Sequence, residues 1–263
     1  MNNPLFEHDV TLEQRVAIKA HLSAGRLLMQ LHRTGVYNAD TQAEAIIINT
    51  IEETFPDDDF LSEEKGLVAK NSNRRWVIDP LDGTNKYYDR KGLNHEKGEF
   101  PFTIGIALEI DQLVILSSVY HPQREELYLA LKGKGAKLNG QPMSVSTKDR
   151  LKDAVLMSHI STRKGPDERT RSAIERIQPR TDYRILRYGS GLAQLCYVAT
   201  GRHDGFFNAD TYLWDIQPAT LLVEEAGGRV TDIYGNKITR DSRSILATNG
   251  KIHDEMLEQL KGF

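Results

Sequence analysis

The stretch "WVIDPLDGTN", residues 76–85, constrains the fold more than any other part of the chain. The apolar run before Asp79 predicts a buried β-strand. Pro80 has no backbone N–H and favours an extended residue before it, and Gly83 allows a sharp turn or a close approach of the backbone to a ligand. Asp79 and Asp82 therefore bring two like charges to the end of a buried strand, where each raises the pKa of the other unless a partner neutralises them.

Two interpretations of these acids remain open at this point. One is a tight turn capped by an aspartate, because Asp side chains accept hydrogen bonds from nearby backbone N–H groups. The other is a divalent cation, because Mg²⁺ binds hard oxygen ligands and keeps water and substrate phosphate in its octahedral shell. The Leu81 carbonyl, the Thr84 hydroxyl and the backbone N–H groups after Gly83 are suited to a site for a metal and an anion.

Acidic residues at two further places favour the cation. The segment "SEEKG" puts Glu63 and Glu64 on a predicted loop before the same strand. Asp215 begins the apolar helical segment in "LWDIQPATLLVEEAGG", where the simplest structural interpretation is an N-cap. Three acidic segments at element ends that face one cleft are better explained by a metal cluster than by three independent caps.

Helical and strand patterns alternate along the chain without the regular βαβ period of a Rossmann unit, which predicts mixed α and β layers. Thr11 and Gln14 form a predicted capping box at the start of the first helix. Pro56 ends the second helix, and residues 57–59 are expected to form a solvated acidic turn. Successive hairpin strands follow over residues 101–140. The later helices are predicted at residues 167–178, 191–200, 215–226 and 251–263, with strands at "DYRILRYG" and "HDGFFNA" and around Val230 and Ala247.

The composition is that of an ordinary globular protein, with 39% hydrophobic and 27% charged residues and a formal net charge of -3. This charge gives no basic excess for a nucleic-acid polymer, so we expect none as a partner. The single cysteine, Cys196, lies in an apolar run and is predicted to pack in the core of a protein from a reducing compartment. No apolar run approaches the ~20 residues of a membrane span, so we expect no membrane association and a cytoplasmic location.

The sequence resembles the inositol monophosphatase family of Mg²⁺-dependent, lithium-sensitive phosphatases. "DPLDGT" at residues 79–84 and "WD" followed by eleven residues and "GG" at residues 214–228 match two family motifs, and the "EE" of Glu63 and Glu64 lies upstream as the family places it. The resemblance implies an α+β fold, a layered αβαβα sandwich of the inositol monophosphatase and fructose bisphosphatase type. It also implies one phosphatase unit over residues 1–263, whose halves, about 1–145 and 146–263, flank the active cleft.

The resemblance further implies hydrolysis of a small phosphorylated polyol or sugar by water, with two Mg²⁺ ions and a third left open. The implied metal ligands are Glu63, Asp79, the Leu81 carbonyl, Asp82 and Asp215. The implied catalytic residues are Glu63, Thr84 and Asp82, with Glu63 and Thr84 positioning the attacking water. The implied substrate contacts are Gly83 and Thr84 through their amides, and Gly189, Ser190, Gly191, Asn208 and Asp215. Family members commonly form dimers, so a homodimer is expected.

Two departures from the family pattern concern the substrate. Asn208 stands where inositol monophosphatases have a glutamate that meets substrate hydroxyls, which puts myo-inositol phosphate in doubt as the main substrate. The segment after "DGTN" is longer than in the human-type members and contains the basic residues Lys86, Arg90, Lys91 and Lys97. These side chains are either solvated or suited to a second phosphate, so an adenosine 3',5'-bisphosphate phosphatase is the alternative. A second alternative is that the protein is a catalytically idle relative with a regulatory role.

Overall fold

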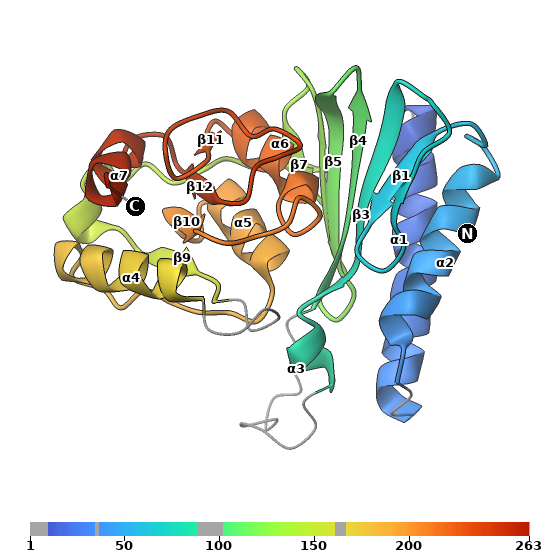
Figure 1. Ribbon diagram of the computed structural model, residues 1–263, viewed down its shortest axis with the longest axis horizontal. Coiled ribbons are helices and arrows are strands. Elements are labelled where there is room, and N and C mark those ends of the chain that lie inside the picture. Colours follow the sequence, from blue (N-terminus) through green and yellow to red (C-terminus); the bar gives the residue numbers. More distant parts are fainter. Residues whose placement is uncertain (1–9, 35–36, 89–101, 161–166, 263) are drawn as a thin grey trace.

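The computed structural model describes residues 10–34, 37–88, 102–160 and 167–262. Its helices and sheets alternate in five layers (Figure 1). Helices α1 and α2 cover the outer face of the first sheet, α5 and α6 lie between the two sheets, and α4 and α7 cover the far side of the second sheet. This arrangement confirms the predicted αβαβα sandwich and the α+β class. None of the described helices combines the length and apolar character that crossing a membrane requires.

The helices are α1 (Leu12–Thr34), α2 (Ala39–Glu52), α3 (Thr84–Tyr88), α4 (Glu168–Ile177), α5 (Gly191–Ala199), α6 (Gln217–Glu225) and α7 (His253–Leu260). The strands of the first sheet are β1 (Asp59–Ser62), β2 (Gly66–Val68), β3 (Arg74–Asp82), β4 (Thr103–Ile110), β5 (Leu113–His121), β6 (Glu126–Leu131), β7 (Ala136–Leu138) and β8 (Gln141–Pro142). The strands of the second sheet are β9 (Leu156–Ser158), β10 (Gly205–Asn208), β11 (Arg229–Thr231) and β12 (Ile245–Thr248).

Each sheet contains one parallel pair, and these two pairs lie where the candidate site residues lie. The first sheet has the order β2-β1-β3-β4-β5-β6-β7-β8, and β1 runs parallel to β3. The second has the order β11-β12-β10-β9, and β9 runs parallel to β10. Because the carboxyl ends of parallel strands meet at one edge, the residues that follow β1 and β9 are placed beside the ends of β3 and β10.

The predicted start of α1 is confirmed in detail. The Gln14 side chain accepts a hydrogen bond from the Thr11 N–H at 2.9 Å, and the Thr11 hydroxyl accepts one from the Gln14 N–H at 3.3 Å. This reciprocal pair satisfies N–H groups that have no intrahelical partner. The buried stripe of α1 then packs with α2 on the first sheet, in one cluster with Trp76 and Ile78.

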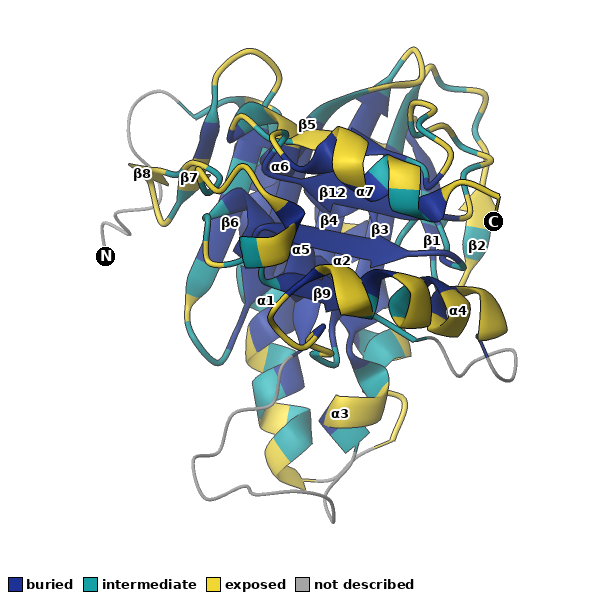
Figure 2. Cartoon of the chain, turned by 90° about the vertical axis from the view of Figure 1, so that its left-hand side faces the viewer, coloured by how far each residue is buried: buried dark blue, intermediate teal, exposed yellow. Residues whose placement is uncertain are grey.

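The helices between the sheets are buried on almost all sides, because they are enclosed by two sheets. Every residue of α5 is buried, and α6 is buried from Gln217 to Val223. Cys196 belongs to this core, and burial raises the pKa of its thiol, which confirms a packing role. By contrast, the outward faces of α4 and α7 are exposed (Figure 2).

The acidic turn at residues 57–59 is not solvated as expected, because only Asp57 is exposed. Asp58 accepts hydrogen bonds from the Trp76 indole N–H at 2.8 Å and from Arg74, so it satisfies a donor that the core encloses. Asp59 accepts from the Lys70 and Ser72 backbone N–H groups. These contacts join residues that are well separated in the sequence, so the local pattern of residues 57–59 does not predict them.

Two predicted segments have a different secondary structure. The segment "FLSEEKGL" is not a loop: β1 and β2 pair antiparallel, and Glu63 and Glu64 lie in the turn between them. The predicted strand "DYRILRYG" is reduced to one parallel bridge between Leu186 and Met157. Tyr183 and Leu186 are exposed there, so burial does not favour a full strand. The basic residues Arg90, Lys91 and Lys97 lie outside the described residues.

Candidate metal and phosphate site

The register of the parallel pair brings Glu63 beside Asp79. Ser62 is the partner of Ile78, so the next residue on each strand is one of the two acids. Glu44 on α2 is fully buried, and its carboxylate accepts hydrogen bonds from the backbone N–H groups of Glu64 and Lys65. This contact fixes the turn that carries Glu63, and the sequence alone gives no local signal for it.

An extra residue in β3 explains how Asp79 and Asp82 share one face of the sheet. Strand β3 does not end at Asp79 as predicted but continues to Asp82, with Gly105 opposite Asp79 and Thr103 opposite Asp82. Three steps on β3 therefore match two on β4, which is the geometry of a β-bulge. Pro80 lies in this irregular segment, where a missing N–H costs least. Without the bulge, side chains three positions apart would point to opposite faces.

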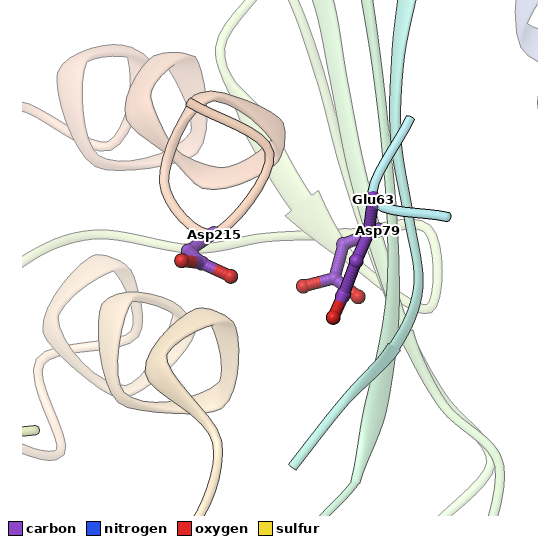
Figure 3. A group of neighbouring side chains, drawn as sticks. All are labelled: Glu63, Asp79 and Asp215. Carbon is purple, nitrogen blue, oxygen red and sulfur yellow. The ribbon is translucent and has the colours of Figure 1, made fainter. Parts of the chain in front are cut away.

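Asp215 approaches the same place from the other half of the molecule. Ligand oxygens of Glu63, Asp79 and Asp215 all lie within 4.8 Å of one another. Figure 3 shows the three carboxylates pointing toward one another, with Asp215 coming from the turn before α6. The prediction that Asp215 is the N-cap of this helix is wrong, because Ile216 occupies that position. The Asp215 carboxylate instead accepts a hydrogen bond from the Tyr212 N–H at 3.1 Å, which orients it within its own turn.

Three carboxylates this close create a strongly negative site. Asp79 is fully buried, and Glu63 and Asp215 are half-buried. Like charges in a low dielectric destabilise one another, and a divalent cation removes this repulsion. An all-oxygen donor set from two or three carboxylates is the set that Mg²⁺ prefers, with water or phosphate completing the shell. The residues present therefore fit a magnesium ion.

Asp82 lies beside this cluster but does not form part of it among the described residues. Its Oδ2 accepts hydrogen bonds from the Ser190 hydroxyl and the Leu192 N–H, both at 2.6 Å. Ser190 is the N-cap of α5 and also accepts from the Ala193 N–H. Asp82 thus holds the N-terminal end of α5 against the first sheet with one oxygen.

The turn after Asp82 has the shape expected for an anion-binding segment. Gly83 has a φ of 96°, which a residue with a side chain adopts only with strain. Its carbonyl accepts hydrogen bonds from Lys86 and Tyr87, so the chain turns at once into α3. The Thr84 hydroxyl donates to the Leu81 carbonyl at 2.9 Å, and the second lone pair of that oxygen is not used in this contact.

A pocket reaches the acidic cluster at Asp215 and contains most of the predicted substrate residues. It is lined by Asp82, Gly83, Thr84, Asn85, His159, Gly189, Gly191, Phe206, Asn208, Asp210, Thr211, Asp215 and Ile216. Ser190 is fully buried behind this surface, and its hydroxyl is engaged by Asp82. Ser190 is therefore placed to support the pocket wall and not to contact a ligand.

Asn208 has a defined orientation at the pocket wall. Its Oδ1 accepts hydrogen bonds from the Asp210 N–H at 2.9 Å and from the Thr170 hydroxyl at 3.1 Å. A backbone N–H can only donate, so the oxygen must face it and the amide nitrogen faces the other way. The position thus presents a hydrogen-bond donor where a glutamate would present an acceptor.

Sequence reasoning missed four polar residues of this pocket: Asn85, His159, Asp210 and Thr211. His159 follows β9, and Asn208 ends the parallel strand β10, so the two share an edge for the same reason that Glu63 and Asp79 do. The signal that His159 and Asn208 share is a polar residue at the end of a short apolar strand. That signal becomes useful only when the strand pairing is known.

Comparisons with known proteins agree with this geometry. The model of the Inositol monophosphatase family matches residues 5–262. The chain is 34% identical to the Nus factor SuhB of Pasteurella multocida, with 94% of each chain covered. It is 32% identical to the inositol-1-monophosphatase of Mesorhizobium japonicum, covering 94% of this chain and 95% of the relative.

A solved structure shows the same architecture. The extragenic suppressor protein suhB of Bartonella henselae superposes with a TM-score of 0.85 at 29% identity, covering 96% of this chain and 99% of the other. The family match spans nearly the whole described chain, including both sheets and the acidic cluster. The chain belongs to the inositol monophosphatase family.

Proposed function

We propose that this protein is a Mg²⁺-dependent phosphomonoesterase that hydrolyses a small phosphorylated polyol or sugar. The observation that carries the proposal is the convergence of Glu63, Asp79 and Asp215, from two halves of the chain, beside a pocket. Such convergence is costly without a cation and is the usual arrangement of a metal-assisted hydrolase. The family resemblance adds a second metal held by Asp79, Asp82 and Asp215.

Each proposed role follows from the position of the residue. Glu63, at the half-buried edge of the cluster, would accept a proton from the attacking water, and the Thr84 hydroxyl would orient that water. The backbone N–H groups of Gly83 and Thr84 would hold the phosphate, and the Leu81 carbonyl would be a further metal ligand. When bound, Mg²⁺ would neutralise the phosphate charge and acidify the water. Asp82 would join the second metal through the oxygen that α5 does not use.

The distal part of the pocket favours a hydroxylated leaving group. The Asn208 amide donates, the Asp210 carboxylate accepts, and a hydroxyl group can do both. Gly191 leaves room at the wall beside them, because a Cβ added there would have no atom nearer than 3.8 Å. Myo-inositol phosphate is one member of this substrate class, and the altered polarity at Asn208 leaves other polyol and sugar phosphates as competitors.

An adenosine bisphosphate phosphatase is the alternative within the same chemistry. The Lys86 side chain lies directly over Gly189, so that a Cβ there would approach the Lys86 Cγ to 2.3 Å. This contact brings a cation to the edge of the pocket, where a second phosphate would be attracted. A substrate with two phosphates would then be preferred over a simple sugar phosphate.

A Nus-factor role is a second candidate from a different class. It is favoured by the identity of 34% to a relative that bears that name. A catalytically idle relative would fit it as well, but the retention of every acid in the cluster favours an active enzyme. We also expect a homodimer, inhibition by lithium and a cytoplasmic location.

The test is a substrate panel with released phosphate as the readout. It compares inositol monophosphate, histidinol phosphate, fructose bisphosphate and phosphoadenosine phosphate, with and without Mg²⁺. Mg²⁺-dependent hydrolysis of a polyol or sugar phosphate is the expected result. Preference for phosphoadenosine phosphate would select the alternative, and no phosphate release from any substrate would contradict an enzymatic function.

A further inference from the structure

A buried polar contact fixes the start of α6, two residues after Asp215, against the first sheet. The Gln217 amide nitrogen donates to Glu109 Oε1 at 2.5 Å, and both residues are almost fully buried. The other oxygen of Glu109 accepts from the Arg240 guanidinium, through Nη2 at 2.9 Å and Nε at 3.1 Å. The Gln217 carbonyl accepts from the Ser117 hydroxyl on β5 at 3.2 Å. The first residue of α6 is thus held through its side chain and its main chain.

The cost of this contact argues that it does more than stabilise the fold. Because the Gln217 amide nitrogen faces a carboxylate, its Oε1 points elsewhere, and it is buried with no hydrogen-bond partner in the part of the chain that the structure describes. A buried acceptor without a partner destabilises the folded state. An apolar residue of the same shape at position 217 would avoid that penalty, but it would leave Glu109 Oε1 without its donor. A buried polar group that costs stability in this way is typical of a residue that supports a functional site.

The face of β4 that receives α6 also sets the distance between the two halves of the metal site. Gly105, Ala107 and Glu109 are two positions apart along β4, so they lie on the same face of the strand. Gly105 pairs with Asp79, and a Cβ at Gly105 would lie only 2.8 Å from the Pro218 Cβ on α6. The helix end therefore contacts the strand directly beside Asp79 and is anchored again four residues along at Glu109.

We propose that Glu109 is a positioning residue for the metal site. Through Gln217 it holds the N-terminal end of α6 at the place where Asp215 can share a cation with Glu63 and Asp79. This inference rests on the proposed metal-dependent function, but it concerns residues that touch neither the metal nor the substrate. Arg240 orients the Glu109 carboxylate from the solvent side, with a third of its own side chain exposed.

The experiment measures Mg²⁺ binding by calorimetry on the full-length protein, without substrate, together with the melting temperature without metal. Glu109→Gln leaves one acceptor oxygen for two donors, Gln217 and Arg240, so both contacts cannot be kept. It should raise the Mg²⁺ dissociation constant about tenfold, the size expected when a residue that orients a metal ligand is lost. The double variant Glu109→Gln with Gln217→Glu restores an amide–carboxylate pair in reverse order. It should recover most of the lost affinity, which a merely structural role of Glu109 does not predict.

Gln217→Met keeps the Glu109–Arg240 pair and removes the buried acceptor without a partner. It also leaves the buried Glu109 Oε1 without its donor, so the melting temperature should fall as it does in the control below, whereas weaker Mg²⁺ binding is expected in Gln217→Met only. This variant serves as the test if Glu109→Gln does not fold. The matched control is Glu225→Gln at the opposite end of α6, where Glu225 accepts from the Gly133 and Gly135 N–H groups. That variant should lower the melting temperature and leave Mg²⁺ binding as in the wild type.

Two outcomes separate this inference from the proposed function. If the wild-type protein binds Mg²⁺ and both Glu109→Gln and Gln217→Met bind it within a factor of two of the wild type, the positioning role is wrong and the proposed function stands. If the wild-type protein binds no Mg²⁺, the proposed function fails with it.

Discussion

Asp79 is the central residue of the acidic cluster, because Glu63 and Asp215 both lie beside it. It is fully buried on β3, it is the neighbour of Glu63 through the β1–β3 register, and Asp215 faces it from the second half. Its Oδ1 also accepts the Leu81 N–H at 3.0 Å, which fixes the carboxylate within the bulge. A change at Asp79 should therefore affect catalysis far more than folding.

Asp79→Asn keeps the size of the side chain and removes its charge. We expect the protein to fold, because the repulsion with Glu63 and Asp215 is relieved, and Mg²⁺-dependent phosphate release to fall by about 10²-fold or more. Phosphate release and circular dichroism check the two parts. The matched control is Asp57→Asn, an exposed acid that should change neither. Wild-type activity in Asp79→Asn would contradict the assignment.

His21 supplies a prediction for the dependence of stability on pH. It is fully buried, its Nε2 lies 2.9 Å from the Ser118 hydroxyl, and burial lowers its pKa to about 3. Between pH 6.5 and about 3 the unfolded chain therefore binds a proton that the folded chain does not. The free energy of unfolding should fall as the pH falls through this window, by up to about 1.4 kcal/mol per pH unit.

His21→Gln keeps a donor toward Ser118 but cannot titrate. Urea unfolding of both proteins at pH 7, 6, 5 and 4 should show a steeper loss of stability in the wild type. His253, whose pKa burial lowers to about 4, contributes in the same direction in both proteins, so it cancels in the comparison. Parallel curves for the two proteins would show that His21 is not the group responsible.

The identities of the site residues could be predicted from the sequence, because the two family motifs and the acids upstream of them contain these residues. The contacts that these residues make could not be predicted. Asp82 is engaged by α5, and Asp215 is oriented by its own turn instead of capping a helix. Both differences depend on partners far away in the sequence or on the shape of a turn, which spacing does not encode.

At the scale of elements, two features position the site. One is the irregular end of β3, and the other is the face of β4 that carries the small residues Gly105 and Ala107. The bulge turns Asp79 and Asp82 to one face, and Gly105 opposite Asp79 leaves space for α5 and α6. A Cβ on Gly105 would lie 2.4 Å from the Leu192 side chain and 2.8 Å from the Pro218 side chain. The packing of both helices against the sheet therefore depends on this glycine.

Gly105→Ala should force α5 and α6 away from the sheet. Overpacking of this kind costs about 1 to 3 kcal/mol, which chemical unfolding will measure. Because α6 carries Asp215, Mg²⁺ binding should weaken as well. Gly133→Ala is the control: no atom lies within 4 Å of an added Cβ there, so only the local strain of its φ of 72° is introduced. A Gly105→Ala protein as stable as the wild type would show that the helices can adjust.

Element positions follow well from the sequence where periodicity and capping agree, as in α1 with its capping box and α4 with Asp167 as its N-cap. They fail where short strands depend on their partners. The β1–β2 pair was expected to be a loop, because strands of three or four residues leave too little alternation to recognise. The segment at Leu186 has a strand-like composition, but it buries Ile185 alone among its apolar side chains while Tyr183 and Leu186 are exposed.

For the whole molecule, the acidic cluster joins two halves that have separate sheets and that share the apolar core between those sheets. Glu63 and Asp79 belong to the first half and Asp215 to the second. A cation bound there would add a link between them, because it binds the folded arrangement and not the unfolded chain. We propose that the halves 1–145 and 146–263 form one phosphatase unit and unfold together.

Mg²⁺ should therefore raise the melting temperature, with a stabilisation of about 2.7 kcal/mol when its concentration is 100 times the dissociation constant. Calorimetry with 10 mM Mg²⁺ or with EDTA measures this shift, and one transition is expected in both. Asp215→Asn should lose most of the shift. Two separate transitions would contradict a single unit, and an unchanged shift in Asp215→Asn would show that the cation binds elsewhere.

The central claim, that carboxylates from both halves share a divalent cation, is tested most directly by the anomalous scattering of Mn²⁺ in a crystal of the protein. We expect manganese within about 2.2 Å of oxygens from Glu63, Asp79 and Asp215, with Asp79 and Asp215 bound to the same ion. A manganese ion that contacts only Glu63 and Asp79, with Asp215 turned away, or no manganese at this place, would contradict the account.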